Sequence, residues 1–223
     1  MTNKICPSLM CMRIPEYTEN LAVFRRTGIE YLHIDVMDGE FVPNYQFGVD
    51  TIKQLRSMSD IPLDIHLMIT RPDEKLEWFD IQPGEYVSIH YESTVHAQRV
   101  LSRIRDRGGR PILALNPATP LCCVENVLED VEAILLMTVN PGYAGQKIIP
   151  QTIQKTAALR KMLDDRGFAH VGIEVDGNIS FENARLLADA GANMFVAGSS
   201  SVFLKGTPVA ENIARMREAI RVE

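Results

Sequence analysis

The sequence lacks both a strong positive charge and a long apolar run. Its 29 acidic and 23 basic residues give a net charge of -6 at pH 7, which argues against nucleic acid or an anionic membrane as the main partner. No stretch approaches the roughly 20 apolar residues of a membrane-spanning helix. The N-terminus also lacks the charged segment and apolar run of a secretory signal. We therefore expect a soluble, cytoplasmic protein.

Cysteine is scarce, and its positions do not form a metal-binding pattern. The four cysteines, Cys6, Cys11, Cys122 and Cys123, do not have the spacing typical of a zinc cluster. A disulfide between the adjacent Cys122 and Cys123 would be strained, so reduced thiols are the simpler interpretation. The sequence has no G-x-G-x-x-G fingerprint of a dinucleotide site.

Short apolar strands alternate regularly with longer amphipathic segments. We predict strands at 4–10, 31–37, 63–69, 86–90, 111–115, 133–139, 171–175 and 194–197. The predicted helices are 15–26, 49–58, 72–79, 95–107, 120–128, 150–166, 181–190 and 208–221. Several strands are apolar on both faces, as in a parallel sheet covered by helices. Eight such units predict an α/β fold, a single-domain TIM (β/α)8 barrel over residues 1–223. An open doubly wound sheet is the alternative.

Polar side chains stand at matched positions near the ends of three strands. Successive side chains of a strand point to opposite faces, so His33 and Asp35 share one face. His66 lies in a second predicted strand of similar pattern, and Asp176 follows a third predicted strand, just before a glycine. Each residue alone is more readily explained as a hydrogen-bonded core residue. Together they predict one divalent metal site, with zinc first and manganese, iron, cobalt or magnesium as alternatives.

Glycine-bearing loops follow the sixth, seventh and eighth predicted strands, at 140–146, 177–178 and 198–201. Glycine lets backbone amides approach an anion without obstruction by a side chain. The joint position of these loops at the carboxyl ends of neighbouring barrel strands predicts a phosphate cradle.

Three methionines, Met37, Met68 and Met137, also lie near strand ends. Core packing is the default for each, but in the pocket they would form an apolar floor that excludes water. We leave His90 out of the predicted site and expect a buried structural hydrogen bond for it. His170 precedes a strand, at the opposite end, and is expected to be solvated.

These stretches together resemble the ribulose-phosphate 3-epimerase family over nearly the whole chain. The matching motifs are P-S-L at 7–9, H-I-D-V-M-D-G at 33–39, F-V-P-N at 41–44, D-I-H-L-M at 64–68, L-N-P at 115–117, M-T-V-N-P-G at 137–142, E-V-D-G at 174–177 and A-G-S at 197–199. So many matches in the same order are highly specific.

The resemblance implies a metal-dependent ketose-phosphate 3-epimerase that works through an enediolate. It implies that the metal ligands are His33, Asp35, His66 and Asp176, and that Asp35 and Asp176 are also the acid/base pair. Ser8 and His66 would touch the sugar. The phosphate end would be bound by Gly142, Tyr143, Ala144, Gly145, Gly177, Asn178, Gly198 and Ser199. The resemblance also implies a homo-oligomer, either a dimer or a hexamer.

Two features instead look like the related D-allulose-6-phosphate 3-epimerases: Met10-Cys11-Met12 and Ala144-Gly145-Gln146. Because most motifs fit the ribulose-phosphate enzymes, we expect interconversion of D-ribulose 5-phosphate and D-xylulose 5-phosphate, with D-allulose 6-phosphate as the alternative. A barrel lyase or aldolase would usually require a lysine at a strand end, and no predicted strand has a lysine in its C-terminal half. The intact pair of aspartates argues against a non-catalytic phosphosugar-binding barrel.

Overall fold

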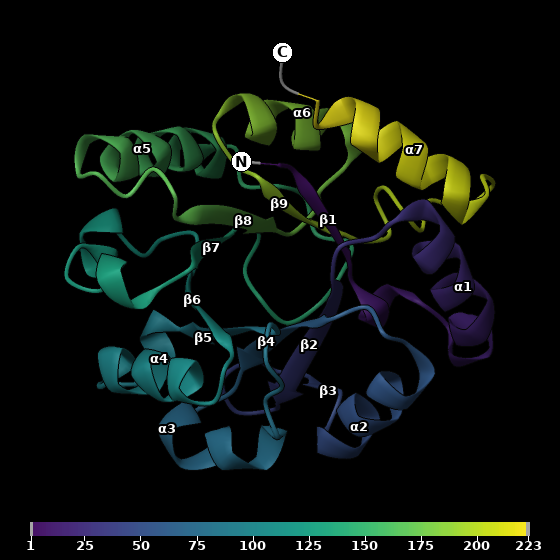
Figure 1. Ribbon diagram of the computed structural model, residues 1–223. Coiled ribbons are helices and arrows are strands. Elements are labelled where there is room, and N and C mark those ends of the chain that lie inside the picture. The colour runs from purple at the N-terminus through teal and green to yellow at the C-terminus, as the bar shows by residue number, and fades with distance from the viewer. Residues whose placement is uncertain (1, 222–223) are drawn as a thin grey trace.

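In the computed structural model, which describes residues 2–221, parallel strands curl into a barrel (Figure 1). The strands are β1 (Lys4–Pro7), β2 (Leu32–Asp38), β4 (Leu63–Met68), β5 (Tyr86–His90), β6 (Arg110–Leu115), β7 (Ala133–Met137), β8 (Gly172–Asp176) and β9 (Met194–Ala197). They pair in the order β1-β9-β8-β7-β6-β5-β4-β2. A parallel bridge between Ser8 and His33 joins the two ends of this order. The predicted TIM (β/α)8 barrel is confirmed.

Helices surround the barrel on its outside (Figure 1). They are α1 (Tyr17–Thr27), α2 (Val49–Met58), α3 (Pro72–Lys75), α4 (Ala97–Asp106), α5 (Gln151–Asp165), α6 (Phe181–Asp189) and α7 (Val209–Ala219). Each longer helix buries residues at helical spacing; α4, for example, buries Val100, Leu101 and Ile104. Within residues 2–221, none of these helices combines the length and apolar character of a membrane span.

The strands carry two layers of buried side chains. Outward-facing residues such as Ile34 and Ile65 join the large core between sheet and helices. Inward-facing residues fill the barrel itself, and they include Ile112, Leu135 and Met194. Because side chains alternate along each strand, His33 and Asp35 of β2 and Asp64 and His66 of β4 point inward with this second set.

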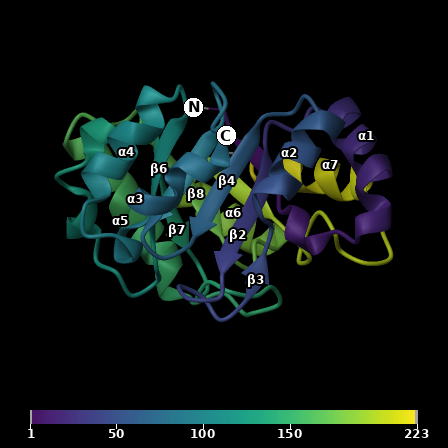
Figure 2. The same cartoon turned by 90° about the horizontal axis from the view of Figure 1, so that it is seen from below.

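Strand β2 continues beyond the barrel into a small antiparallel addition. Its last residues, Met37 and Asp38, pair with β3 (Tyr45–Gln46). Figure 2 shows the arrowheads of β2 and β4 at the same end of the barrel as β3. The carboxyl ends of the parallel strands therefore meet at one mouth, where the polar residues of the predicted site lie.

The structure differs from the predicted elements in a few places. The predicted helix at 120–128 is wrong: two 3₁₀ turns, Leu121–Val124 and Leu128–Asp130, lie in the link between β6 and β7. Such turns are often found in connections between regular elements. The first strand ends at Pro7 because a 3₁₀ turn, Leu9–Cys11, follows it. β3 was not predicted. Residues 1, 222 and 223, the ends of the predicted domain, lie outside the described residues.

A buried ion pair links α2 to the turn before β5. Arg56 donates from Nε and Nη2 to the two carboxylate oxygens of Glu85, at 2.8 and 2.7 Å. Glu85 also accepts from the backbone N–H of Gln82 at 2.9 Å and is only 3% exposed. The charge of Glu85 therefore depends on a few protein donors rather than on water.

We expect Arg56→Ala to lower the free energy of unfolding by about 3 kcal/mol, because the buried charge of Glu85 would lose its partner. Urea unfolding measures the change. The matched control is Arg25→Ala, whose ion pair with Asp60 has side chains 65% and 74% exposed. That variant should lose less than about 1 kcal/mol. Equal losses in the two variants would contradict the argument.

Candidate active site

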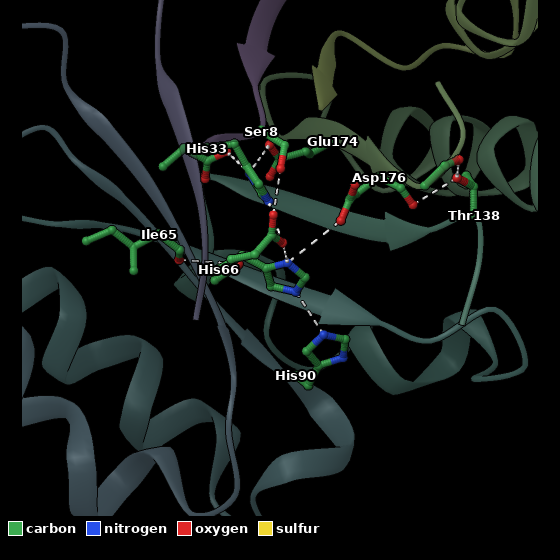
Figure 3. A network of polar contacts seen from close by, with 12 residues as sticks. Ser8, His33, Ile65, His66, His90, Thr138, Glu174 and Asp176 are labelled. Atoms are coloured by element: carbon green, nitrogen blue, oxygen red, sulfur yellow. Dashed lines mark hydrogen bonds and ion pairs between the residues drawn. The ribbon is translucent and has the colours of Figure 1, made fainter. Parts of the chain in front are cut away.

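Four polar side chains converge inside the mouth of the barrel (Figure 3). His33 and Asp35 come from β2, His66 from β4, and Asp176 ends β8. Each offers one ligand atom, and these atoms all lie within 4.8 Å of one another. The sheet register explains the convergence, because Asp35 stands directly beside His66 on the neighbouring strand.

The closest contacts in the cluster involve Asp35. Its Oδ1 lies 3.3 Å from both His33 Nε2 and His66 Nδ1, and its Oδ2 accepts a hydrogen bond from the Ser8 hydroxyl at 2.8 Å. His66 Nδ1 also lies 3.8 Å from Asp176 Oδ2. Two imidazole nitrogens and two carboxylates, nearly all buried, are the donor set that divalent ions such as zinc or manganese prefer. The cluster could therefore hold a divalent metal ion.

The two aspartates of the cluster differ in their tendency to hold a proton. Burial, together with the negative charge of Asp35, raises the pKa of Asp176 to about 7. Burial acts on Asp35 as well, but its contacts with His33 and His66 outweigh that effect and hold the pKa of Asp35 well below its usual value. One carboxyl is thus ionised while the other can carry a proton near neutral pH.

A second buried group lies on the far side of His33. His33 Nδ1 is 2.6 Å from Asp64 Oδ2, so Asp64 fixes the orientation of this ring. Asp64, Glu174 and Cys6 form a compact buried group. Burial and then the charge of Asp64 raise the pKa of Glu174, which favours its neutral form. We assigned no role to Asp64 or Glu174 from the sequence, where the only signal was a polar residue inside an apolar strand.

A pocket opens beside the cluster and is lined by the three glycine-bearing loops. Its lining includes residues 141–146, 177–179 and 198–200, together with Ser8 and Asp35. Met37, Met68 and Met137 line it as well, and their role as a floor that excludes water stays a prediction. Met10 and Cys11 complete the wall after β1. Asp35 and Asp176 of the four-residue cluster and the glycine loops therefore face one shared space.

The turn after β8 requires glycine. Gly177 has a φ of +116°, and a Cβ on it would lie 2.5 Å from Val139 Cγ2 and 2.9 Å from Val139 N. The Thr138 hydroxyl donates to the carbonyl of Asp176 at 2.8 Å, which ties the ends of β7 and β8 together. Close packing of the two loops therefore fixes the backbone that presents Asp176.

The chain matches the model of the ribulose-phosphate 3 epimerase family over residues 4–203. It belongs to this family. The chain is 38% identical over 197 residues to ribulose-phosphate 3-epimerase of Bacillus subtilis (strain 168), an alignment that covers 88% of this chain and 91% of that protein. The Escherichia coli (strain K12) protein of the same name is also 38% identical over 197 residues, covering 88% and 87%.

Solved structures of other proteins share the fold of this family member. KGPDC from Streptococcus mutans superimposes with a TM-score of 0.72 and covers 98% of this chain and 97% of that one. Its sequence identity is only 14%, so the likeness concerns the barrel alone.

The structure brings the predicted site residues of this epimerase-family chain together at the mouth. All the predicted substrate-binding residues except His66 line the pocket, and His66 lies beneath it in the cluster. Their contacts with a substrate stay predictions. His90, which we left out of the site, is fully buried, and its Nε2 lies 2.9 Å from His66 Nε2. His170 is exposed, as expected.

A loop after β2 crosses toward the glycine-bearing loop after β7. Asn44 Nδ2 donates to the carbonyl of Gly142 at 2.9 Å, and Phe41 packs on His90 with ring centroids 4.8 Å apart. At the base of this loop, Asp38 accepts from Lys75 Nζ at 2.8 Å. Burial favours neutral Asp38, but Lys75 and backbone N–H groups hold its pKa well below the usual range. The loop thus connects the buried cluster to the glycine loops.

Proposed function

We propose that the protein is a metal-dependent ketose-phosphate 3-epimerase that interconverts D-ribulose 5-phosphate and D-xylulose 5-phosphate. The observation that carries the proposal is the pair Asp35 and Asp176, which come from separate strands, meet in one cluster and differ in proton affinity. Membership of the ribulose-phosphate 3 epimerase family supports it. We assign the whole chain to one barrel domain.

Epimerisation removes a proton from the carbon beside the ketone and returns one to the other face. Each face needs its own carboxyl group, one ionised as base and one protonated as acid. Asp35 and Asp176 would take these roles, and the Ser8 hydroxyl, bonded to Asp35 Oδ2, would hold that carboxylate in place and touch the sugar. The two aspartates exchange roles in the reverse direction.

His33, Asp35, His66 and Asp176 would hold the metal ion, with zinc as the first choice for this donor set and manganese, iron, cobalt or magnesium as alternatives. When bound, the ion would supply the positive charge that stabilises the enediolate as it develops. His66 would also lie against the sugar. The three methionines of the floor would keep water from the reacting carbon.

The glycine loops would bind the phosphate through backbone amides. This group lies away from the reacting carbon, so its binding energy would orient the substrate over the two aspartates.

We retain the cytoplasmic location and a dimer or hexamer as predictions. The net charge of -6 supports a small-molecule substrate rather than nucleic acid or an anionic membrane.

Turnover with a defined metal content tests the function. Purified protein should contain about one divalent ion per chain, and NMR in D₂O should show D-ribulose 5-phosphate converted to D-xylulose 5-phosphate with deuterium at C3. A chelator should abolish turnover without unfolding the barrel, and added zinc or manganese should restore it. Binding of the phosphosugar without any exchange at C3 would favour the non-catalytic alternative instead.

We expect Asp35→Asn and Asp176→Asn each to lower kcat by about 10²–10⁴-fold, since each removes one proton carrier. Metal content is measured in both variants so that lost metal is not mistaken for lost proton transfer. Asp60→Asn, an exposed change outside the site, is the control.

If the carboxyls serve opposite faces, each variant should retain C3 proton exchange from one epimer more than from the other. Near-normal turnover in either metal-loaded variant would remove that aspartate from the mechanism.

The ratio of kcat/KM for D-ribulose 5-phosphate to kcat/KM for D-allulose 6-phosphate, measured with the same metal, identifies the preferred substrate. We expect a ratio above one. The substrates differ by one hydroxymethylene, which a pocket often discriminates by only ~1–3 kcal/mol, so some activity on both is expected. Met10 lines the pocket and could adapt to a longer chain. A ratio well below one would make the allulose reaction the main one and leave the two-aspartate mechanism untouched.

A further inference from the structure

His66 uses its two ring nitrogens in different directions. Nδ1 faces the cluster, 3.3 Å from Asp35 Oδ1, while Nε2 points away and lies 2.9 Å from His90 Nε2 (Figure 3). Both rings are fully buried and lie nearly parallel, with centroids 5.0 Å apart and an interplanar angle of 26°. The contact between the rings is therefore direct.

Two ring nitrogens at this distance share one proton, since two N–H groups would clash and two lone pairs would repel. If Nδ1 of neutral His66 gives its lone pair to a metal, the proton of that ring must be on Nε2. His66 then donates and His90 Nε2 accepts. The proton of neutral His90 is consequently on Nδ1.

His90 Nδ1 has a matching acceptor. It lies 3.2 Å from Glu92 Oε2. The other oxygen of Glu92 accepts from the backbone N–H of Asn116 at 2.9 Å and from the Thr119 hydroxyl. The carboxylate is thus anchored by the chain after β6, and its remaining oxygen is left for His90.

We propose that His90 and Glu92 are positioning residues that fix the tautomer and ring orientation of His66 and so set the affinity for the metal. The inference rests on the proposed metal-dependent function. It is a relay of two hydrogen bonds, from His66 through His90 to the anchored carboxylate of Glu92. Partners of this kind raise the basicity of a ligating imidazole and restrict its rotation.

The two candidate histidine ligands are therefore held in different ways. His33 faces the cluster with Nε2, and Asp64 bonds its Nδ1 directly at 2.6 Å. His66 faces the cluster with Nδ1, so its free nitrogen lies farther along the ring and meets a second imidazole instead. Because His90 spans the remaining distance, an apolar ring in its place would leave the His66 Nε2–H buried without an acceptor.

The zinc dissociation constant, measured by competition with a chromophoric chelator, tests the proposal. His90→Phe should weaken zinc binding by about 10- to 100-fold. His90→Gln should recover most of that loss, because its amide oxygen can accept from His66. Ser88→Ala is the matched control: Ser88 is buried on β5 two residues from His90, and its hydroxyl makes a long contact of 3.5 Å with the Ile65 carbonyl. It should bind zinc as the unaltered protein does.

Nitrogen-15 NMR of the zinc-loaded, unaltered protein gives a second readout that does not depend on a variant folding. We expect protons on His66 Nε2 and His90 Nδ1, and none on His66 Nδ1 or His90 Nε2. The opposite tautomer at either ring, or unchanged zinc affinity in His90→Phe, would overturn this inference but not the proposed metal-dependent function. Failure of the unaltered protein to bind zinc, manganese or iron would overturn the proposed metal-dependent function together with it.

Discussion

The closure of the barrel between β1 and β2 determines the geometry of the candidate site. Ser8 pairs with His33 through the backbone, and its hydroxyl bonds Asp35 two residues farther along β2. The same short segment therefore completes the sheet and orients the carboxylate that contacts both imidazoles. If the pairing of β1 with β2 shifted by one residue, the inward-facing side chains of β2 would point toward the helices instead. Fold and site consequently depend on one register.

That register concentrates acidic groups where water is excluded. Asp35, Asp64 and Glu174 are at most 4% exposed, and Asp176 ends the same strand that carries Glu174. Unpaired carboxylates in such a place would be costly, so protons and the histidines must offset their charge. The raised pKa values of Glu174 and Asp176 and the lowered value of Asp35 express this balance. A divalent ion would add positive charge where the carboxylates are closest.

The sequence predicted the barrel and the four clustered residues because both follow from local periodicity. Alternation along one strand puts His33 and Asp35 on one face, and the barrel architecture places strand ends together. The sequence alone could not predict contacts that depend on the register between strands. His90 looked like an isolated core histidine because its partner His66 lies 24 residues earlier. The helix predicted at 120–128 is wrong for another reason, because short 3₁₀ turns have too little periodicity to be distinguished from an α-helix in the sequence.

The site separates two tasks in space. At its base, the imidazoles are buried and held by Asp64 or His90, so the atoms that would meet a metal have little freedom. Toward the mouth, the pocket wall consists of loops, with Tyr143 55% exposed and Met10 only partly buried. Changes in the loops can alter the space in the pocket without disturbing the candidate metal ligands beneath. The proposed two-aspartate chemistry would therefore serve ketose phosphates of different length, since only the distance from the reacting carbon to the phosphate would change.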